Sequence, residues 1–256
     1  MKSLRHELWG GLCRESQLKY AQDYTGFVFS HLPPSLRRLH LSQEFKRMLH
    51  ARGDRLTWWS KSMSFLAGFV RASRQLEHLT VYDIVDAAHF LGNHTLRSVR
   101  QHDHKWTNLQ TLCLRSSRMR PDRRGDVDAL LQRAAVAALS MPKLCRMELW
   151  GCEDGKGCHF CYRVSDGRRQ HRLTWRSNWD EDLRFSRPTE RLWSRVARQQ
   201  YVFADLDVRY MPIPVRRLEN ERMRLVILHG WSSPPDVLGA LSIYQLVVED
   251  RNCLRL

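Results

Sequence analysis

Apolar residues recur along the chain in an L-x-x-L-x-L arrangement with polar residues between them. Within each copy the last three positions alternate apolar, polar and apolar, which is typical of a short strand with one buried face. The copies start 33 to 40 residues apart, and each follows a break in the pattern or a helix end. The pattern therefore predicts near-parallel strands at 36–41, 76–81, 109–114 and 144–149, followed by weaker ones at 203–208 and 223–228.

The segments between these strands have helical periodicity. In VDALLQRAAVAALSM, residues 127–141, apolar residues recur at i, i+3, i+4 and i+7, with Asp126 at the expected N-cap and Pro142 just past the end. Residues 61–73 show a similar stripe, and a helix opened by Thr189 brings Trp193 and Val196 to one side. HFCYRV and HRLTWRS, which flank an Asp-Gly pair, predict a β-hairpin.

Helices that alternate with short strands at a regular spacing predict an α/β fold. We expect a degenerate leucine-rich-repeat-like arc of stacked helix–strand units, in which each unit buries its apolar stripe against its neighbours. Ser117 and Cys152 occupy positions where such repeats usually carry Asn or Cys. The expected organisation is one domain over 1–256, with a helical lead-in at 1–30, an inserted hairpin at 158–176 and a helix/strand cap at 189–256.

Residues that flank the apolar positions of the strands should point away from the core. Stacked in register, they would form one concave surface with the Arg, Tyr and Trp side chains that are enriched in binding hot spots. The alternative is that a helix or a chain terminus covers this face. The predicted partner-binding residues are Arg38, His40, His78, Thr80, Tyr82, Arg115, Arg146, Glu148 and Trp150.

Composition and charge narrow the class of partner. The 256 residues include 42 Lys and Arg against 27 Asp and Glu, a net charge of +15, which suggests an acidic protein or a nucleic acid. A general abundance of arginine is the other explanation. Nucleic-acid binding is the less favoured class, because no helix-turn-helix, zinc-finger or RNP pattern accompanies the charge. No apolar stretch predicts a signal peptide or a membrane span, so we expect a cytoplasmic or nuclear protein with reduced thiols.

Candidate metal and catalytic groups are incomplete. Cys158-x-x-Cys161, with His159 and His171 nearby, is half of a zinc site, but a second ligand pair is missing and strand alternation would point the two thiols to opposite faces. A His102-x-His104 pair is better explained as part of a polar loop. No Walker A, G-x-S-x-G or H-E-x-x-H sequence occurs, so we expect no enzyme activity, no metal and no cofactor.

The run AAVAALSMPKLCRMELWG, followed by HFCYRV and LTWRS, resembles a fungal domain of unknown function. That domain lies C-terminal to an F-box-like segment in F-box and leucine-rich-repeat-like proteins, and the resemblance covers roughly residues 25–250. It implies a protein-interaction module that selects substrates for an F-box-type ubiquitin ligase. The chain lacks the L-P-x-E-I opening of an F-box, so a Skp1-type adaptor is expected only if the full-length product contains one. The alternative function is a basic nucleic-acid-binding protein.

Overall fold

The chain folds into a mixed α/β structure built on one eight-stranded sheet. A computed structural model describes residues 2–8, 32–43, 63–82, 84–92, 106–153, 155–165, 169–181 and 183–213. The sheet order follows the sequence, β1 to β8. The strands are β1 (Ser3–Leu8), β2 (Arg38–Gln43), β3 (His78–Tyr82), β4 (Thr111–Arg115), β5 (Arg146–Glu153), β6 (Lys156–Ser165), β7 (Gln170–Ser177) and β8 (Asp205–Pro212).

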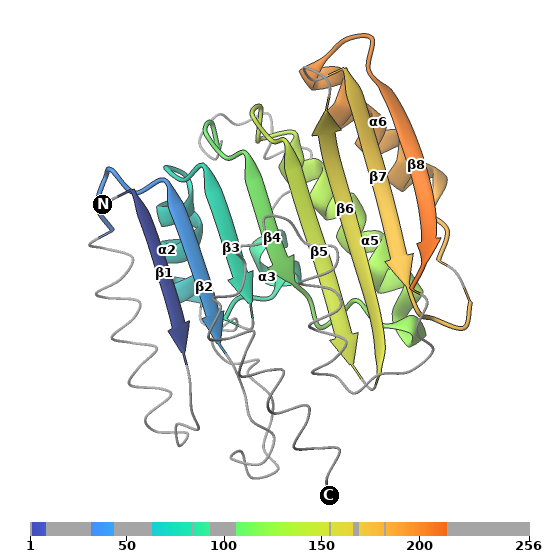
Figure 1. The fold of residues 1–256 in the computed structure, drawn as a ribbon, viewed down its shortest axis with the longest axis horizontal. Coiled ribbons are helices and arrows are strands. Elements are labelled where there is room, and N and C mark those ends of the chain that lie inside the picture. Colours follow the sequence, from blue (N-terminus) through green and yellow to red (C-terminus); the bar gives the residue numbers. More distant parts are fainter. Residues whose placement is uncertain are drawn as a thin grey trace, which may run out of the picture. The chain divides into compact units, whose positions relative to one another are not determined.

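Four α-helices and one short 3₁₀ helix accompany the strands in the described part of the chain. They are α2 (Met63–Ser73), α3 (Ala87–Phe90), η3 (Pro121–Arg123), α5 (Arg124–Ala138) and α6 (Arg187–Gln200). Helix α2 lies against one face of the β1–β3 part of the sheet, and α6 against one face of the β6–β8 part (Figure 1). None of these helices is long and apolar enough to span a membrane.

The chain divides into two compact units, which are described separately. The first comprises Met1–Arg115 with Arg133–Met147, and the second comprises Ser116–Gln132 with Glu148–Leu256. The predicted α/β class is confirmed. Strands β2, β3, β4 and β5 lie close to the four predicted positions, and β2, β3 and β4 pair in parallel. The assignment of the whole chain to one domain stays a prediction.

Each repeat copy in the first unit enters the sheet through the same hydrogen-bond pattern. Two successive N–H groups donate to one carbonyl of the preceding segment: Glu77 and His78 to Arg37 at 2.8 and 3.0 Å, and Gln110 and Thr111 to Glu77 at 2.7 and 3.1 Å. The same pairing joins Arg37 and Arg38 to Lys2, and Cys145 and Arg146 to Gln110. The first leucine of each copy lies before this pair of N–H donors and outside the strand. Each strand therefore begins two residues later than predicted.

The leucines of the repeat form an in-register apolar ladder across β2, β3 and β4. Leu39 pairs with Leu79, and Leu79 pairs with Leu112. Two residues further along the strands, Leu41 pairs with Val81. All of these side chains are at most 2% exposed, as are the leading residues Leu36, Leu76, Leu109 and Leu144. The ladder is the core of the first unit, and it fixes which face of each strand remains for polar residues.

Two predicted elements were wrong in type or register. The predicted helical lead-in begins instead with strand β1, in which Leu4 pairs with Leu39 of β2. In the copy at 203–208, Phe203 is not a core residue: it lies in the turn before β8 and is 84% exposed. The remainder of the lead-in and the predicted strand at 223–228 lie outside the described residues.

The predicted hairpin is present and belongs to the sheet. Strands β6 and β7 pair antiparallel from Cys158–Ser177 to Ser165–Gln170, and β8 then runs parallel to β7. Helix α6 covers β6 through Trp193, whose ring lies 5.1 Å from Phe160 and 4.9 Å from Tyr162. These rings make the aromatic core of the second unit.

Helix starts differ from the predicted ones because other residues supply the caps. Helix α6 begins at Arg187, and Ser186 is its N-cap, with Oγ accepting from the Thr189 N–H at 3.3 Å. Helix α5 continues from η3 and begins at Arg124, so Asp126 lies in its first turn rather than at its N-cap. The Asp128 carboxylate of α5 accepts hydrogen bonds from the hydroxyls of Ser186 and Thr189, both at 2.7 Å.

We expect Asp128→Asn to lower the free energy of unfolding by about 1–2 kcal/mol at pH 7, because these hydrogen bonds favour a charged acceptor. Burial raises the pKa of Asp128, but the bonds from Ser186 and Thr189 outweigh it, so the pKa is lowered. A lowered pKa means that the stabilisation is complete above the ordinary aspartate value of about 3.9 and is lost as the pH falls through the folded value. Urea unfolding from pH 7 to pH 2.5 should therefore show the two proteins converging at acid pH. A pH-independent gap would contradict this explanation.

Candidate functional site

Polar side chains stack in rows on the sheet face opposite the apolar ladder of the first unit. Strand register places Arg38 beside His78 and His78 beside Thr111. One step along, His40 lies beside Thr80 and Thr80 beside Cys113. We call this surface the outer face; it consists of Arg38, His40, His78, Thr80, Tyr82, Thr111, Cys113, Arg115 and Arg146. The stacking in register that the sequence predicted is thus present in β2–β4.

The first row combines a fixed positive charge with a neutral imidazole. His78 Nδ1 and Thr111 Oγ1 share a hydrogen bond of 2.9 Å. Burial, and then the neighbouring Arg38 charge, lower the pKa of His78. His78 is therefore neutral near pH 7, and Arg38, which is exposed, carries the positive charge of this row.

The second row is packed more tightly than an open surface. Tyr82 is only 3% exposed and Cys113 only 7%. The Tyr82 hydroxyl and Cys113 Sγ lie 3.6 Å apart, and the Tyr82 ring meets His40 edge-on at 5.7 Å. The expectation that Tyr82 is open to a partner is therefore not met. His40, Thr80, Arg115 and Arg146 are half-buried.

Glu148 and Trp150, predicted on the same surface, are in the second unit and are both 1% exposed. Their strand, β5, is buried at six consecutive positions, so both of its faces are covered there. Glu148 Oε2 lies 3.5 Å from Nε2 of His159 on β6, which makes an acid–imidazole pair with both side chains 2% exposed. Glu148 and Trp150 are thus buried residues, contrary to the expected accessible positions.

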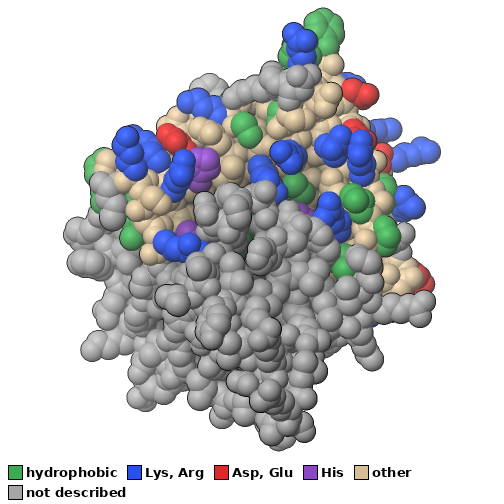
Figure 2. Space-filling model, in the orientation of Figure 1, with side chains coloured by type: hydrophobic (Ala, Val, Ile, Leu, Met, Phe, Trp, Pro, Cys, Tyr) green, Lys and Arg blue, Asp and Glu red, His purple; other side chains and the backbone are tan. Residues whose placement is uncertain are grey.

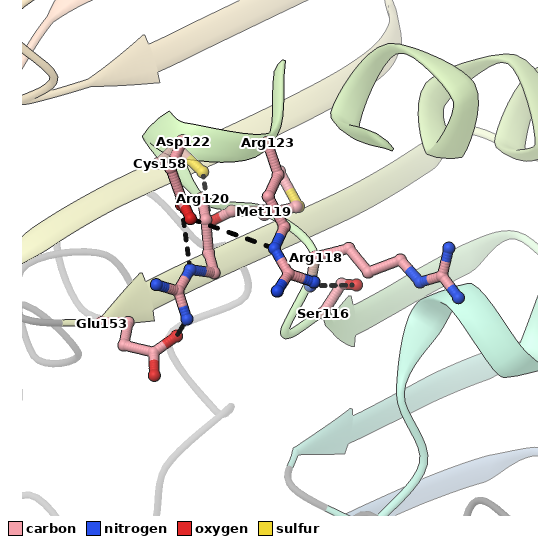
Figure 3. Close-up of polar contacts among 8 residues, drawn as sticks. All are labelled: Ser116, Arg118, Met119, Arg120, Asp122, Arg123, Glu153 and Cys158. Carbon is pink, nitrogen blue, oxygen red and sulfur yellow. Dashed lines mark hydrogen bonds and ion pairs between the residues drawn. The ribbon is translucent and has the colours of Figure 1, made fainter. Parts of the chain in front are cut away.

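The turn after β4, residues 116–123, is held by ion pairs and hydrogen bonds (Figure 3). Arg120 forms ion pairs with Asp122 at 3.0 Å and Glu153 at 2.9 Å. The hydrogen bond from Arg120 lowers the pKa of Asp122. Ser116 rather than Ser117 is buried, and its Oγ accepts from the Arg118 N–H at 3.2 Å. The sequence shows Asp122 two residues from Arg120, which suggests one of these ion pairs. Glu153 is distant in sequence, and only the fold brings it to Arg120.

Gly151 lets this turn approach β5. A Cβ at position 151 would lie 2.7 Å from both Cβ and the carbonyl oxygen of Met119, and 3.0 Å from the Ser116 carbonyl oxygen. We expect Gly151→Ala to lower the free energy of unfolding by about 2 kcal/mol, since backbone atoms must shift. Gly125→Ala in α5 is the matched control, because a Cβ there meets nothing within 4 Å; it should stabilise by about 0.5–1 kcal/mol. Equal effects of the two substitutions in urea unfolding would contradict this account.

The half zinc site is dispersed over the two faces of the hairpin. Cys158 and Cys161 pair with Ser177 and Thr174, positions of opposite orientation on β7. Burial raises the pKa of the Cys158 thiol well above its ordinary value, so this thiol is protonated at neutral pH. His171 shares a hydrogen bond of 2.8 Å with the Tyr162 hydroxyl. No group of three or more His, Cys, Asp or Glu residues among the described positions could hold a metal ion, and His102 and His104 lie outside them.

Positive charge predominates on one face of the described structure. In the orientation of Figure 1, the visible charged side chains are more often Lys or Arg than Asp or Glu (Figure 2). On β7 and β8, Arg172 and Arg209 both contact Asp207 at 2.8 Å. These two arginines are therefore paired within the sheet, while Arg38 forms no ion pair with another described residue. The Arg38 guanidinium can donate paired hydrogen bonds to a carboxylate or phosphate group.

Comparisons with known proteins give one assignment. No curated protein and no solved structure matches the chain. A family model matches residues 31–229, which include strands β2 to β8 and every predicted partner-binding residue. The match spans more than three quarters of the chain. The chain therefore belongs to the family of unknown function DUF6546.

Proposed function

We propose that this protein is a protein-interaction module that binds an acidic partner through the outer face. The observation that carries the proposal is the stack of polar side chains in register on the face opposite the apolar ladder, with Arg38 exposed at its edge. Parallel strands hold these side chains at fixed spacing, so the surface is largely preorganised for binding. We propose no catalytic role for this surface.

The accessible part of the outer face is narrower than the sequence predicted. Arg38 is its one exposed member among the predicted residues, and His40, His78, Thr80, Arg115 and Arg146 are half-buried. Arginine can bind a carboxylate through two parallel hydrogen bonds, while Thr and neutral His add uncharged donors and acceptors. This mixture favours a protein with acidic side chains over a bare polyphosphate chain at this face.

Two finer parts of the proposal come from the repeat and from the resemblance. The recurring strand entry at Lys2, Arg37, Glu77 and Gln110 supports a leucine-rich-repeat-like arc built from equivalent units. Substrate selection for an F-box-type ubiquitin ligase is the cellular role that we propose for such a module. It requires an F-box in the full-length product, and co-purification of a Skp1-type adaptor with that product tests it.

Affinity capture from native lysate tests the binding surface, using charge reversal at Arg38 and Arg146. The matched control reverses Arg71 and Lys143, which are exposed elsewhere in the first unit and change the net charge equally. We expect the amount of partner captured by the Arg38→Glu, Arg146→Glu protein to fall at least tenfold. The Arg71→Glu, Lys143→Glu protein should capture the same amount as the unaltered protein. Equal loss in both would mean that net charge alone recruits the partner, and would overturn the proposal.

A further inference from the structure

Helix α6 has one apolar face and one arginine-rich face. Thr189, Trp193, Val196 and Ala197 are buried in the second unit. The opposite side carries exposed arginines at intervals of four, four and three residues: Arg187, Arg191, Arg195 and Arg198. With about 1.5 Å of rise per residue, neighbouring arginines are about 4.5–6 Å apart along the helix axis. We call these four residues the arginine ladder.

The arginine ladder is not balanced by the rest of the described structure. None of its four side chains forms an ion pair with another described residue, whereas exposed Arg124 and Arg172 pair with Glu181 and Asp207 at 2.8 Å. Within α6 the only acidic residue is Glu190. Side chains of Arg187, Glu190, Arg191, Ser194 and Arg198 line a shallow hollow of about 390 Å³ along the helix. Four arginines and one glutamate give this helix a formal charge of +3.

An exposed aromatic residue lies just beyond the end of the arginine ladder. The connection between α6 and β8 carries Val202, 76% exposed, and Phe203, 84% exposed. The Phe203 and Tyr201 rings lie 6.1 Å apart in a T-shaped arrangement, and most of the Phe203 side chain remains open to solvent. An exposed phenylalanine that contributes nothing to the core is the second observation that needs an explanation.

We propose that the arginine ladder and Phe203 bind a single-stranded nucleic acid. The regular spacing of the guanidinium groups suits a chain of phosphates, to which arginine donates bidentate hydrogen bonds. An exposed ring at the end of the charged row provides a platform on which an unpaired base can stack. This site lies on a different element from the outer face and takes a different class of ligand, so it goes beyond the proposed protein-binding function.

Two other ligands fit these residues less well. A double helix would contact the arginines through its phosphates but would offer Phe203 no unstacked base. A lipid bilayer normally receives the apolar face of an amphipathic helix, and the apolar face of α6 is already buried against Phe160 and Tyr162 through Trp193. A single strand uses both the charge row and the ring.

Fluorescence anisotropy with a labelled 20-nucleotide oligo-uridine RNA tests the site. Phe203→Ala should weaken binding about tenfold by removing the stacking platform, without a change in the thermal midpoint. Arg191→Gln with Arg195→Gln should weaken binding and reduce the slope of log Kd against log salt by about 1.4, at about 0.7 per lost phosphate contact. The RNA should bind at least tenfold more tightly than a 20-base-pair duplex.

The matched control replaces Arg123 and Arg163 by Gln, because both are exposed in the same unit, outside α6, and the change in net charge is equal. We expect this control to bind the RNA like the unaltered protein. Loss of binding equal to that of the arginine-ladder variant would overturn the proposal, as would a Phe203→Ala protein with unchanged affinity. Phe203-dependent binding to vesicles containing phosphatidylserine, with no binding of the RNA, would assign the site to a membrane surface and would also overturn it.

Discussion

Replacing Trp193 by Ala is expected to lower the free energy of unfolding by about 3–5 kcal/mol, the range for truncating a buried aromatic residue. Trp193 is fully buried, lies 5.1 Å from Phe160 and 4.9 Å from Tyr162, and donates from Nε1 to the Leu131 carbonyl oxygen at 3.2 Å. Its loss would remove these contacts between α6 and β6 and would leave a cavity in the aromatic core. Urea unfolding followed by circular dichroism measures the effect.

Trp193→Phe is the matched control, because it keeps an aromatic ring and removes the N–H donor. We expect it to cost about 1–2 kcal/mol. Helix α6 also carries the arginine ladder, so Trp193→Ala should weaken RNA binding, while Trp193→Phe should not. A Trp193→Ala protein as stable as the unaltered one would show that α6 is not docked on β6.

Replacing Trp150 by Ala is expected to lower the free energy of unfolding by a similar amount, about 3–5 kcal/mol. Trp150 is 1% exposed, and its carbonyl oxygen accepts from the Ser116 N–H at 2.9 Å, so it belongs to packed structure rather than to an open binding surface. The measurement is the urea midpoint of the purified variant.

Arg38→Ala provides the comparison for Trp150→Ala, since Arg38 is an exposed member of the outer face. It should change stability by less than about 0.5 kcal/mol. If Trp150→Ala were equally harmless while partner capture fell, Trp150 would be an accessible binding residue and its burial here would be refuted.

The strands of this fold could be predicted because their information is local. Leu39 and Leu41, Leu79 and Val81, and Leu112 and Leu114 alternate with polar residues, and alternation alone places them on one face. The hairpin was predictable for the same reason, since an Asp-Gly pair separates two alternating segments. The outer-face rows then followed from the register of those leucines.

Other features depend on contacts between residues distant in sequence. Glu148 and His159 look like ordinary polar strand residues, and only the adjacency of β5 and β6 makes them a buried pair. Strand β1 was missed because Leu4 and Leu8, four residues apart, fit a helix as well as a strand, and only the pairing of Leu4 with Leu39 decides between them. The same limit applies to α6: its four arginines are visible in sequence, but only the structure shows that they lack partners among the described residues.

Site-specific photocrosslinking tests the outer face as a protein-binding surface most directly. The photoreactive residue p-benzoylphenylalanine would replace Thr80, in the centre of the outer face, or Ala67, which is exposed on α2, and both proteins would be irradiated in native lysate. We predict a discrete, nuclease-resistant protein adduct from position 80 that is absent from position 67 and is lost when Arg38 and Arg146 are reversed to Glu. Adducts of equal yield from both positions, or a nuclease-sensitive adduct from position 80, would contradict the proposal.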